Sequence, residues 1–156
     1  MTKNKPLIIA EIGNNHEGNI NLALEMLEKA RECGVDLIKF QAGTADGFAR
    51  TPEQIDFYKT FILTKHEYKR LYKRGKELKI PVFFSCFPIY EFEEFKQLEY
   101  FKIPARQCNS LYIQNYATDT TFISIPHTLN YPKMLGITKG IPMHCVTEYP
   151  AQNPLI

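Results

Sequence analysis

Three ionisable side chains lie within or directly after short apolar runs of this 156-residue chain. Glu11 follows the apolar run at residues 7–10, and Lys39 and Lys102 lie inside two later ones. A carboxylate at the end of a buried strand can act as a general base or accept a hydrogen bond from a substrate hydroxyl. A buried ammonium group is costly without an anionic partner. Two lysines for one such acid favour a bound anionic ligand, and pairing of the lysines with internal acids is the alternative.

The run at residues 7–10 predicts a buried strand, because it is apolar and rich in β-branched residues. A polar, glycine-containing loop follows at residues 13–19. Asn19 is a favourable N-cap residue, and the apolar spacing after it predicts a helix that ends at Gly34. Together these stretches form one strand–loop–helix unit, in which functional residues typically gather at the carboxyl end of the strand.

The same pattern recurs along the chain. Further strands are predicted at residues 35–40, 81–86, 100–104, 121–125 and 143–146. A loop is expected at residues 42–51, then a short helix from Pro52 towards Phe61. Thr64 and Glu67 predict a capping box that begins a further helix. An aromatic, acidic helix is expected at residues 90–98, and little regular structure between Ile125 and Met143.

Alternating strands and helices predict a parallel sheet, either an open doubly wound sheet or a (β/α)8 barrel. No GxGxxG sequence follows the first strand, which argues against a dinucleotide-binding fold. Polar residues at several strand ends favour the barrel, namely Glu11, Lys39, Ser85, Lys102 and Thr147. Six strands are fewer than eight, and a barrel typically takes about 250 residues. The predicted fold is therefore α/β, a partial (β/α)8 TIM-type barrel of about six βα units in a single domain over residues 1–156.

Composition excludes several classes of protein. The formal net charge is +2 and no basic stripe alternates with aromatic residues, which argues against nucleic-acid binding. No apolar run is long enough to cross a membrane. The four cysteines lack CxxC spacing, so they predict reduced thiols of a cytoplasmic protein rather than a zinc site. His16 either caps a turn or contacts substrate, and for His144 a core position is the alternative to a functional one. The residues themselves predict no metal site.

Five stretches together resemble the N-acetylneuraminate (sialic acid) synthase family. They are residues 8–18 (IIAEIGNNHEG), 35–41 (VDLIKFQ), 83–85 (FFS), 101–103 (FKI) and 144–150 (HCVTEYP). The resemblance implies a barrel enzyme, a transferase of carbohydrate biosynthesis, that condenses phosphoenolpyruvate with an N-acyl sugar aldehyde of the N-acetylmannosamine type. The products would be a nonulosonic (sialic) acid and phosphate, with Mn²⁺ or Mg²⁺ assisting. Which N-acyl sugar is used stays open.

The resemblance also implies roles for individual residues. Glu11 matches the family's acid beside the reacting centre, and Lys39 and Lys102 match lysines that hold phosphoenolpyruvate. The substrate-binding candidates are Lys39, Gln41, Ser85, Lys102, Thr147 and Tyr149, and the secondary candidates are Asn14, His16, Arg106 and His144.

This chain departs from the family pattern at several points. After the third strand it has Ser85-Cys86-Phe87-Pro88 where the family usually has Ser-Thr-Pro-Phe, and after the fourth it has Pro104-Ala105-Arg106 in place of a small serine-containing turn. The family's metal-binding histidines lie on strands seven and eight, which together with the C-terminal antifreeze-like domain are absent from the sequence. A truncated, catalytically inactive anion-binding or scaffold remnant is therefore the alternative function. Open sheet edges predict a homo-oligomer or a missing partner segment.

Overall fold

The computed structural model describes residues 5–109, 111, 115–126 and 139–147. The chain divides into two compact units, residues 1–92 and residues 93–156.

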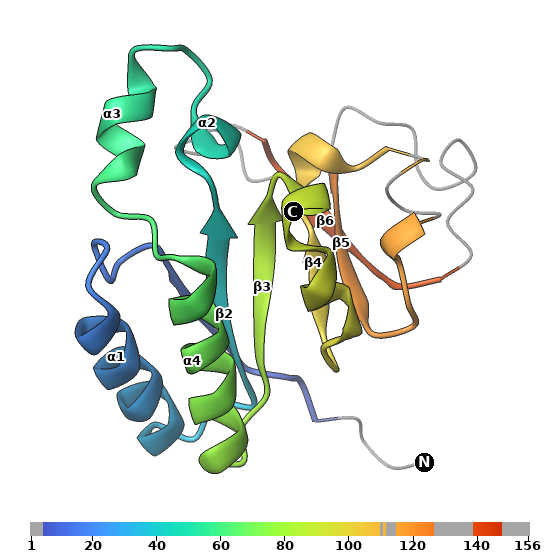
Figure 1. The fold of residues 1–156 in the computed structure, drawn as a ribbon. Coiled ribbons are helices and arrows are strands. Elements are labelled where there is room, and N and C mark those ends of the chain that lie inside the picture. The colour runs from blue at the N-terminus through green and yellow to red at the C-terminus, as the bar shows by residue number, and fades with distance from the viewer. Residues whose placement is uncertain (1–4, 110, 112–114, 127–138, 148–156) are drawn as a thin grey trace. The chain divides into compact units, whose positions relative to one another are not determined.

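From residue 5 onward, the first unit contains three parallel strands and four α-helices (Figure 1). Its elements are β1 (Ile9–Gly13), α1 (Ile20–Glu32), β2 (Leu37–Gly43), α2 (Ala45–Phe48), α3 (Gln54–Lys59), α4 (Lys65–Glu77) and β3 (Val82–Phe87). β2 pairs with β1 on one side and with β3 on the other, both in parallel. Helical crossovers between parallel neighbours are the expected connection, because a tight turn cannot join two parallel strands.

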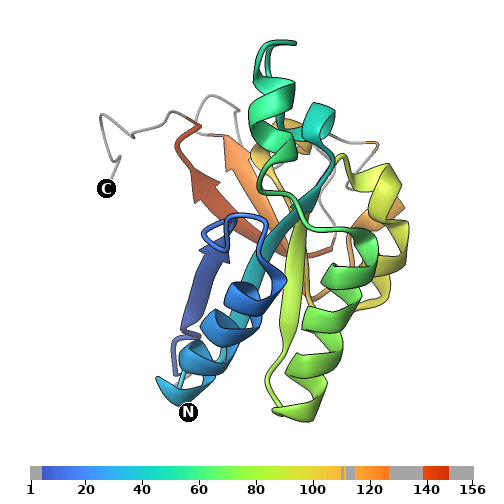
Figure 2. The same cartoon turned by 60° about the vertical axis from the view of Figure 1, so that its left-hand side comes forward.

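Helices α1 and α4 lie side by side along the sheet of this unit (Figure 2). The Asn19 side chain accepts hydrogen bonds from the backbone at the start of α1, and Thr64 and Glu67 form the predicted capping box of α4. The Arg74 guanidinium on α4 contacts Glu28 on α1 at 2.8 Å. The hydrogen bonds of Asn19, Thr64 and Glu67 confirm both predicted helix starts.

Aromatic side chains fill the space between α4 and the sheet. Tyr68 on α4 is fully buried and meets Phe84 of β3 edge to face, with ring centroids 5.8 Å apart. Phe40 of β2 packs beside Phe84 at 6.3 Å. Because successive strand residues point to opposite faces, Lys39, Gln41 and Ser85 project from the face away from α4.

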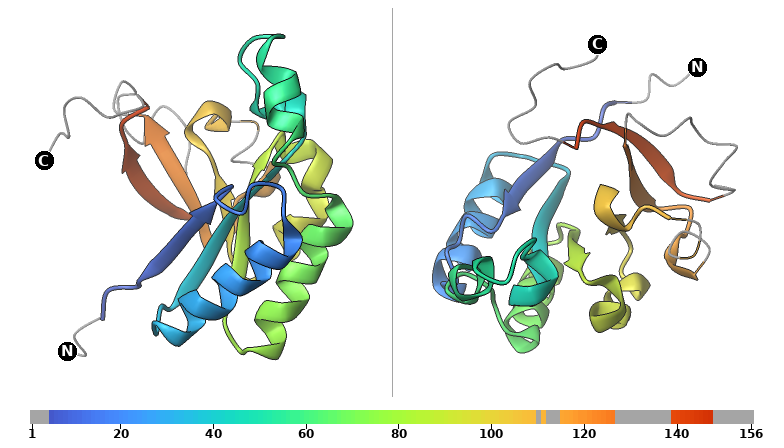
Figure 3. Two further views of the ribbon diagram at one scale, coloured as in Figure 1. Left: turned by 90° about the vertical axis from the view of Figure 1, so that its left-hand side faces the viewer. Right: turned by 90° about the horizontal axis from the view of Figure 1, so that it is seen from above.

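Among its described residues, the second unit contains three short parallel strands, β4 (Phe101–Ile103), β5 (Thr121–Pro126) and β6 (Ile141–Cys145), and the 3₁₀ turn η2 (Ala105–Gln107) (Figure 3). β5 pairs with β4 and with β6. A 3₁₀ segment, η1 (Ile89–Gln97), spans the boundary of the two units in the sequence.

Several predicted boundaries are wrong. β1 begins two residues later than expected and includes Glu11, because ladder pairing starts at Ile9 opposite Leu37. β2 likewise runs on through Gln41 to Gly43, where a loop was predicted. Pairing with β3 continues to that point, so strand geometry extends past the apolar run. The last strand begins at Ile141 instead of Met143.

Two predicted elements differ in kind. The rest of the predicted loop at residues 42–51 contains α2, whose N-cap Thr44 accepts a hydrogen bond from the Gly47 backbone. The predicted helix at residues 90–98 is the 3₁₀ segment η1, interrupted at Phe92 by non-helical backbone angles. The Phe92 ring is buried and its centroid lies 6.0 Å from that of Tyr68. The helix is therefore interrupted at the residue that packs against α4. The segment expected to be least regular, between Ile125 and Met143, falls mainly outside the described residues.

Candidate functional site

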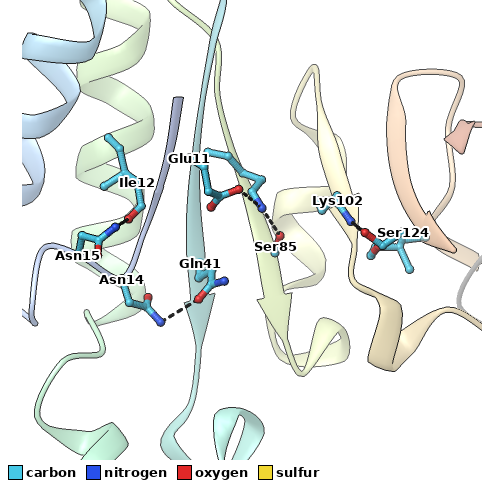
Figure 4. A network of polar contacts seen from close by, with 10 residues as sticks. Glu11, Ile12, Asn14, Asn15, Gln41, Ser85, Lys102 and Ser124 are labelled. Atoms are coloured by element: carbon cyan, nitrogen blue, oxygen red, sulfur yellow. Dashed lines mark hydrogen bonds and ion pairs between the residues drawn. The ribbon is translucent and has the colours of Figure 1, made fainter. Parts of the chain in front are cut away.

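Glu11, Lys39 and Ser85 form a polar cluster across three adjacent strands of the first unit (Figure 4). Glu11 of β1 lies opposite Lys39 of β2 in the ladder, and their side chains form an ion pair. The Lys39 Nζ also donates to the Ser85 Oγ of β3 at 3.4 Å. The Lys39 side chain is 13% exposed and the Glu11 side chain 54%. A mostly buried cation is therefore held beside a carboxylate that solvent and small ligands can reach.

A β-bulge shapes the backbone beside Glu11. The β1–β2 register shifts between Glu11 and Gly13, and Gly13 has a positive φ of 59°. A Cβ at Gly13 would stand 3.6 Å from Glu11 Oε1 and 3.9 Å from Gln41 Cδ. Bulges of this kind redirect a side chain and often lie next to active sites. Here the bulge brings the carboxylate of Glu11 and the amide of Gln41 to the same glycine.

Asn14 extends the cluster towards the loop after β1. Its Nδ2 donates to Gln41 Oε1 at 3.0 Å (Figure 4). Its Oδ1 is buried and accepts no hydrogen bond within the part of the chain that the structure describes. Since a buried polar atom normally has a partner, this oxygen is an unsatisfied acceptor beside the cluster. Asn14 was only a secondary candidate from the sequence.

His16 is fully buried in the same loop, with its ring centroid 6.2 Å from that of Phe40. Its Nδ1 accepts a hydrogen bond from the Gly18 backbone amide. This contact is the turn-capping role, one of the two alternatives predicted for His16. Nε2 has no partner among the described residues. Burial lowers the pKa of His16, and the charge of Glu67 opposes that effect.

We expect His16 to make the protein less stable as the pH falls below about 6.5, the ordinary value for histidine. Below that pH the unfolded chain binds a proton at His16, whereas the folded chain resists it because its pKa is lower. The melting temperature should fall from pH 7.5 to pH 5.5. His16→Asn should melt at a lower temperature throughout but with a flatter dependence on pH.

The control for this experiment is His66→Asn, which removes an exposed histidine from the start of α4. It should melt at about the same temperature as the unaltered chain at pH 7.5. An equal flattening in both variants would contradict a special role for His16.

Lys102 has a comparable environment in the second unit. It is 5% exposed, and its Nζ donates to the Ile103 carbonyl at 3.1 Å and to the Ser124 hydroxyl of β5. Cys108 lies near it, and burial raises the pKa of this thiol while the charge of Lys102 opposes that rise. Sequence reasoning assigned no role to Ser124, because the stretch Ser124-Ile125-Pro126-His127 departs too far from the family pattern. The available signal was a serine inside the otherwise apolar run Phe122-Ile123-Ser124-Ile125.

The remaining candidates belong to the second unit. Arg106 is exposed on η2, His144 is exposed on β6, and Thr147 is exposed directly after β6. Tyr149 lies outside the described residues. For all of them the sequence-based roles stay predictions.

The described residues contain no group of three or more His, Cys, Asp or Glu side chains that could hold a metal ion. The donors of these described residues do not by themselves fit the Mn²⁺ or Mg²⁺ that the sequence resemblance implies, and we assign no step to a metal. Within the same residues, no helix is long and apolar enough to cross a membrane.

Comparison with known proteins gives a consistent result. The profile of the NeuB family matches residues 26–155. N,N'-diacetyllegionaminic acid synthase of Campylobacter jejuni is 28% identical over 94% of this chain and 53% of its own length. N-acetylneuraminate-9-phosphate synthase of Mus musculus is 54% identical over 25% of this chain and 11% of its own length.

Among solved structures, the N-acetylneuraminic acid (sialic acid) synthetase of Leptospira borgpetersenii, crystallised with citrate, superposes with a TM-score of 0.73 at 27% identity. The match covers 94% of this chain and 56% of the synthetase. The chain therefore spans about half the length of this synthetase and of the Campylobacter jejuni synthase. The predicted α/β fold, six parallel strands of a TIM-type barrel, is confirmed.

Proposed function

The chain belongs to the NeuB family, and we propose that it carries the phosphoenolpyruvate side of a synthase that joins this enol phosphate to an N-acyl sugar aldehyde. The proposal depends chiefly on one observation. A mostly buried ammonium, that of Lys39, shares one sheet face with the Ser85 hydroxyl and the Gln41 amide and adjoins an accessible carboxylate. The family's relatives named as sialic, legionaminic and pseudaminic acid synthases support the reaction class.

Lys39 and Ser85 would bind the anion. Phosphoenolpyruvate carries a phosphate and a carboxylate, and a charge-assisted hydrogen bond from an ammonium is stronger than a neutral one. The Ser85 hydroxyl adds a neutral donor at the same place.

Glu11 would move the proton. In the proposed reaction the methylene carbon of the enol phosphate forms a bond to the aldehyde carbon, and the aldehyde oxygen takes up a proton. Water adds to the carbon that bears the phosphate. The bond between this carbon and the phosphate oxygen then breaks, which releases phosphate and leaves a 2-keto acid. A half-exposed carboxylate beside the anion site can accept the proton from the attacking water or a hydrogen bond from the sugar hydroxyl.

We assign Lys102 a related role in the second unit. Like Lys39, Lys102 is a lysine within a strand, and its Nζ donates a hydrogen bond to a serine hydroxyl on the following strand. We propose that Lys102 also binds an anionic ligand, and that Thr147 and Tyr149 serve the sugar and phosphoenolpyruvate sides. Cytoplasmic location and homo-oligomeric assembly remain predictions from the sequence.

The first test measures phosphate release from phosphoenolpyruvate with a colorimetric assay, with and without N-acetylmannosamine. The second measures binding of phosphoenolpyruvate alone by calorimetric titration. A functional synthase releases phosphate only when both substrates are present, and Glu11→Gln loses that release. Binding of phosphoenolpyruvate without any turnover would instead support the inactive anion-binding remnant. Absence of both would contradict the proposal.

A further inference from the structure

One hydrogen bond decides which end of the Gln41 side chain faces the polar cluster. The Asn14 Nδ2 donates to Gln41 Oε1 at 3.0 Å, and the Gln41 nitrogen points away from Asn14 (Figure 4). Within the part of the chain that the structure describes, Gln41 Nε2 donates to no other group. Because a side-chain amide carries both of its donors on nitrogen, two N–H groups of Gln41 remain for a ligand.

The Gln41 amide belongs to the same patch as the ammonium of Lys39. The two residues alternate along β2, so their side chains leave the same face about 6.6 Å apart along the strand. Ser85 lies directly opposite Gln41 in the β2–β3 ladder. Its Oγ accepts a hydrogen bond from Lys39 at 3.4 Å, so its own hydrogen is left to donate. The three side chains therefore bring an ammonium, a hydroxyl and an amide nitrogen to one patch.

A Gln41 side chain without an anchor would turn the other way. The two ends of its amide are alike in size, and rotation about the last side-chain bond exchanges two donors for an acceptor. The Lys39 ammonium attracts the oxygen end, because that end carries the negative partial charge. An oxygen turned to this patch would repel an anion. The hydrogen bond from Asn14 opposes that rotation, since it holds the oxygen on the loop side.

Asn14 is itself placed by the backbone around it. It follows the β-bulge at Gly13 directly, and backbone hydrogen bonds from Asn15 to Ile12 and from Glu17 to Asn14, at 3.1 and 3.0 Å, close the turn. The buried Oδ1 of Asn14 has no partner among the described residues. The reverse arrangement of the two amides would satisfy this oxygen through Gln41 Nε2, but would turn Gln41 Oε1 to the patch. The observed arrangement therefore leaves one acceptor unsatisfied and keeps donors on the patch.

We propose that Asn14 is a positioning residue that holds the Gln41 amide with its nitrogen available to the anion at Lys39. Lys39, Ser85 and Gln41 then donate together to the oxygens of one ligand, while Asn14 contacts Gln41 and not the ligand. That this ligand is phosphoenolpyruvate rests on the proposed function.

The experiment is calorimetric titration of the whole chain with phosphoenolpyruvate. Asn14→Asp should weaken binding at least about tenfold, because a carboxylate only accepts hydrogen bonds and the Gln41 amide must turn its nitrogen away from the anion. Asn14→Leu leaves the amide free to rotate and should weaken binding about threefold to tenfold. A bond that merely fastens the loop to β2 would survive in Asn14→Asp, and binding would then not change.

Two controls separate orientation from charge. Asn15→Asp adds the same charge at the neighbouring, exposed residue and should change binding by less than about threefold. In a Gln41→Met background, Asn14→Leu should have little further effect, because Asn14 acts through Gln41. An undiminished effect of Asn14→Leu in that background would overturn the inference.

NMR of the side-chain amides reports the orientation itself. The Gln41 signals are identified by their loss in Gln41→Met. They should shift when phosphoenolpyruvate is added to the unaltered chain and stay in place in Asn14→Asp. If phosphoenolpyruvate binds through Lys39 but these signals do not move, or if Asn14→Asp binds as tightly as Asn15→Asp, only this inference fails. If phosphoenolpyruvate does not bind the unaltered chain, the proposed function fails with it.

Discussion

Lys39→Ala weakens binding of phosphoenolpyruvate by about a hundredfold. A hydrogen bond to a charged group contributes about 1.5–3 kcal/mol, and each 1.4 kcal/mol corresponds to a tenfold change in affinity. The variant also leaves the Glu11 carboxylate without its cation, so the site changes from neutral to negative. The loss should therefore reach the upper end of that range.

Glu11→Gln should have the opposite effect on binding. In this structure the carboxylate competes with any ligand for the Lys39 ammonium. A neutral amide releases that ammonium, so phosphoenolpyruvate should bind several-fold more tightly, even though the variant loses the proton acceptor needed for turnover. Opposite signs for two residues of one ion pair are a distinctive result, since a merely structural pair would weaken binding in both variants.

Isothermal titration calorimetry at low ionic strength measures both variants. The control is Lys73→Ala, which removes the same charge from the exposed surface of α4. It should bind as the unaltered chain does. If Lys39→Ala binds phosphoenolpyruvate as tightly as Lys73→Ala does, the anion site is not at Lys39.

The sequence predicts the local elements that its own residues specify. Asn19 and the pair Thr64 and Glu67 mark helix starts because their side chains bond the first backbone amides of the same helix. The strand order follows from alternation of strands and helices. The lysines inside apolar runs point to the polar cluster, because a buried charge requires a partner.

Other features depend on contacts between distant segments. The hydrogen bond between Asn14 and Gln41 joins residues 27 positions apart in the sequence. The hydrogen bond between Lys102 and Ser124 joins residues 22 positions apart. The extension of β2 to Gly43 needs β3 as its partner. The close approach of Gly18 to the Thr60 carbonyl also joins distant segments, and no local pattern announces it. Such features arise from tertiary packing, so a single sequence read by propensity and periodicity does not predict them.

Tyr68→Ala destabilises the first unit by about 3–5 kcal/mol, the range for removing a large buried aromatic side chain. Tyr68 is fully buried between α4 and the sheet, where its ring meets Phe84 and Phe92 edge to face at 5.8 and 6.0 Å. Burial raises the pKa of its phenol to about 12, so the hydroxyl stays protonated at every working pH. The alanine variant loses both the apolar contacts and an acceptor for the Leu63 backbone amide, which bonds the hydroxyl at 3.2 Å.

Tyr68→Phe separates these two contributions, because it keeps the ring and removes only the oxygen. The Leu63 amide then loses that acceptor, and a buried polar group without a partner costs about 1–3 kcal/mol. In a chain of this size about 1 kcal/mol lowers the melting temperature by roughly 2–4 °C. Circular dichroism melts should therefore rank the unaltered chain above Tyr68→Phe, and Tyr68→Phe above Tyr68→Ala, with the exposed-ring variant Tyr90→Ala close to the unaltered chain. A Tyr68→Phe variant as stable as the unaltered chain would show that water or another group satisfies the Leu63 amide. The stabilisation would then come from the ring alone.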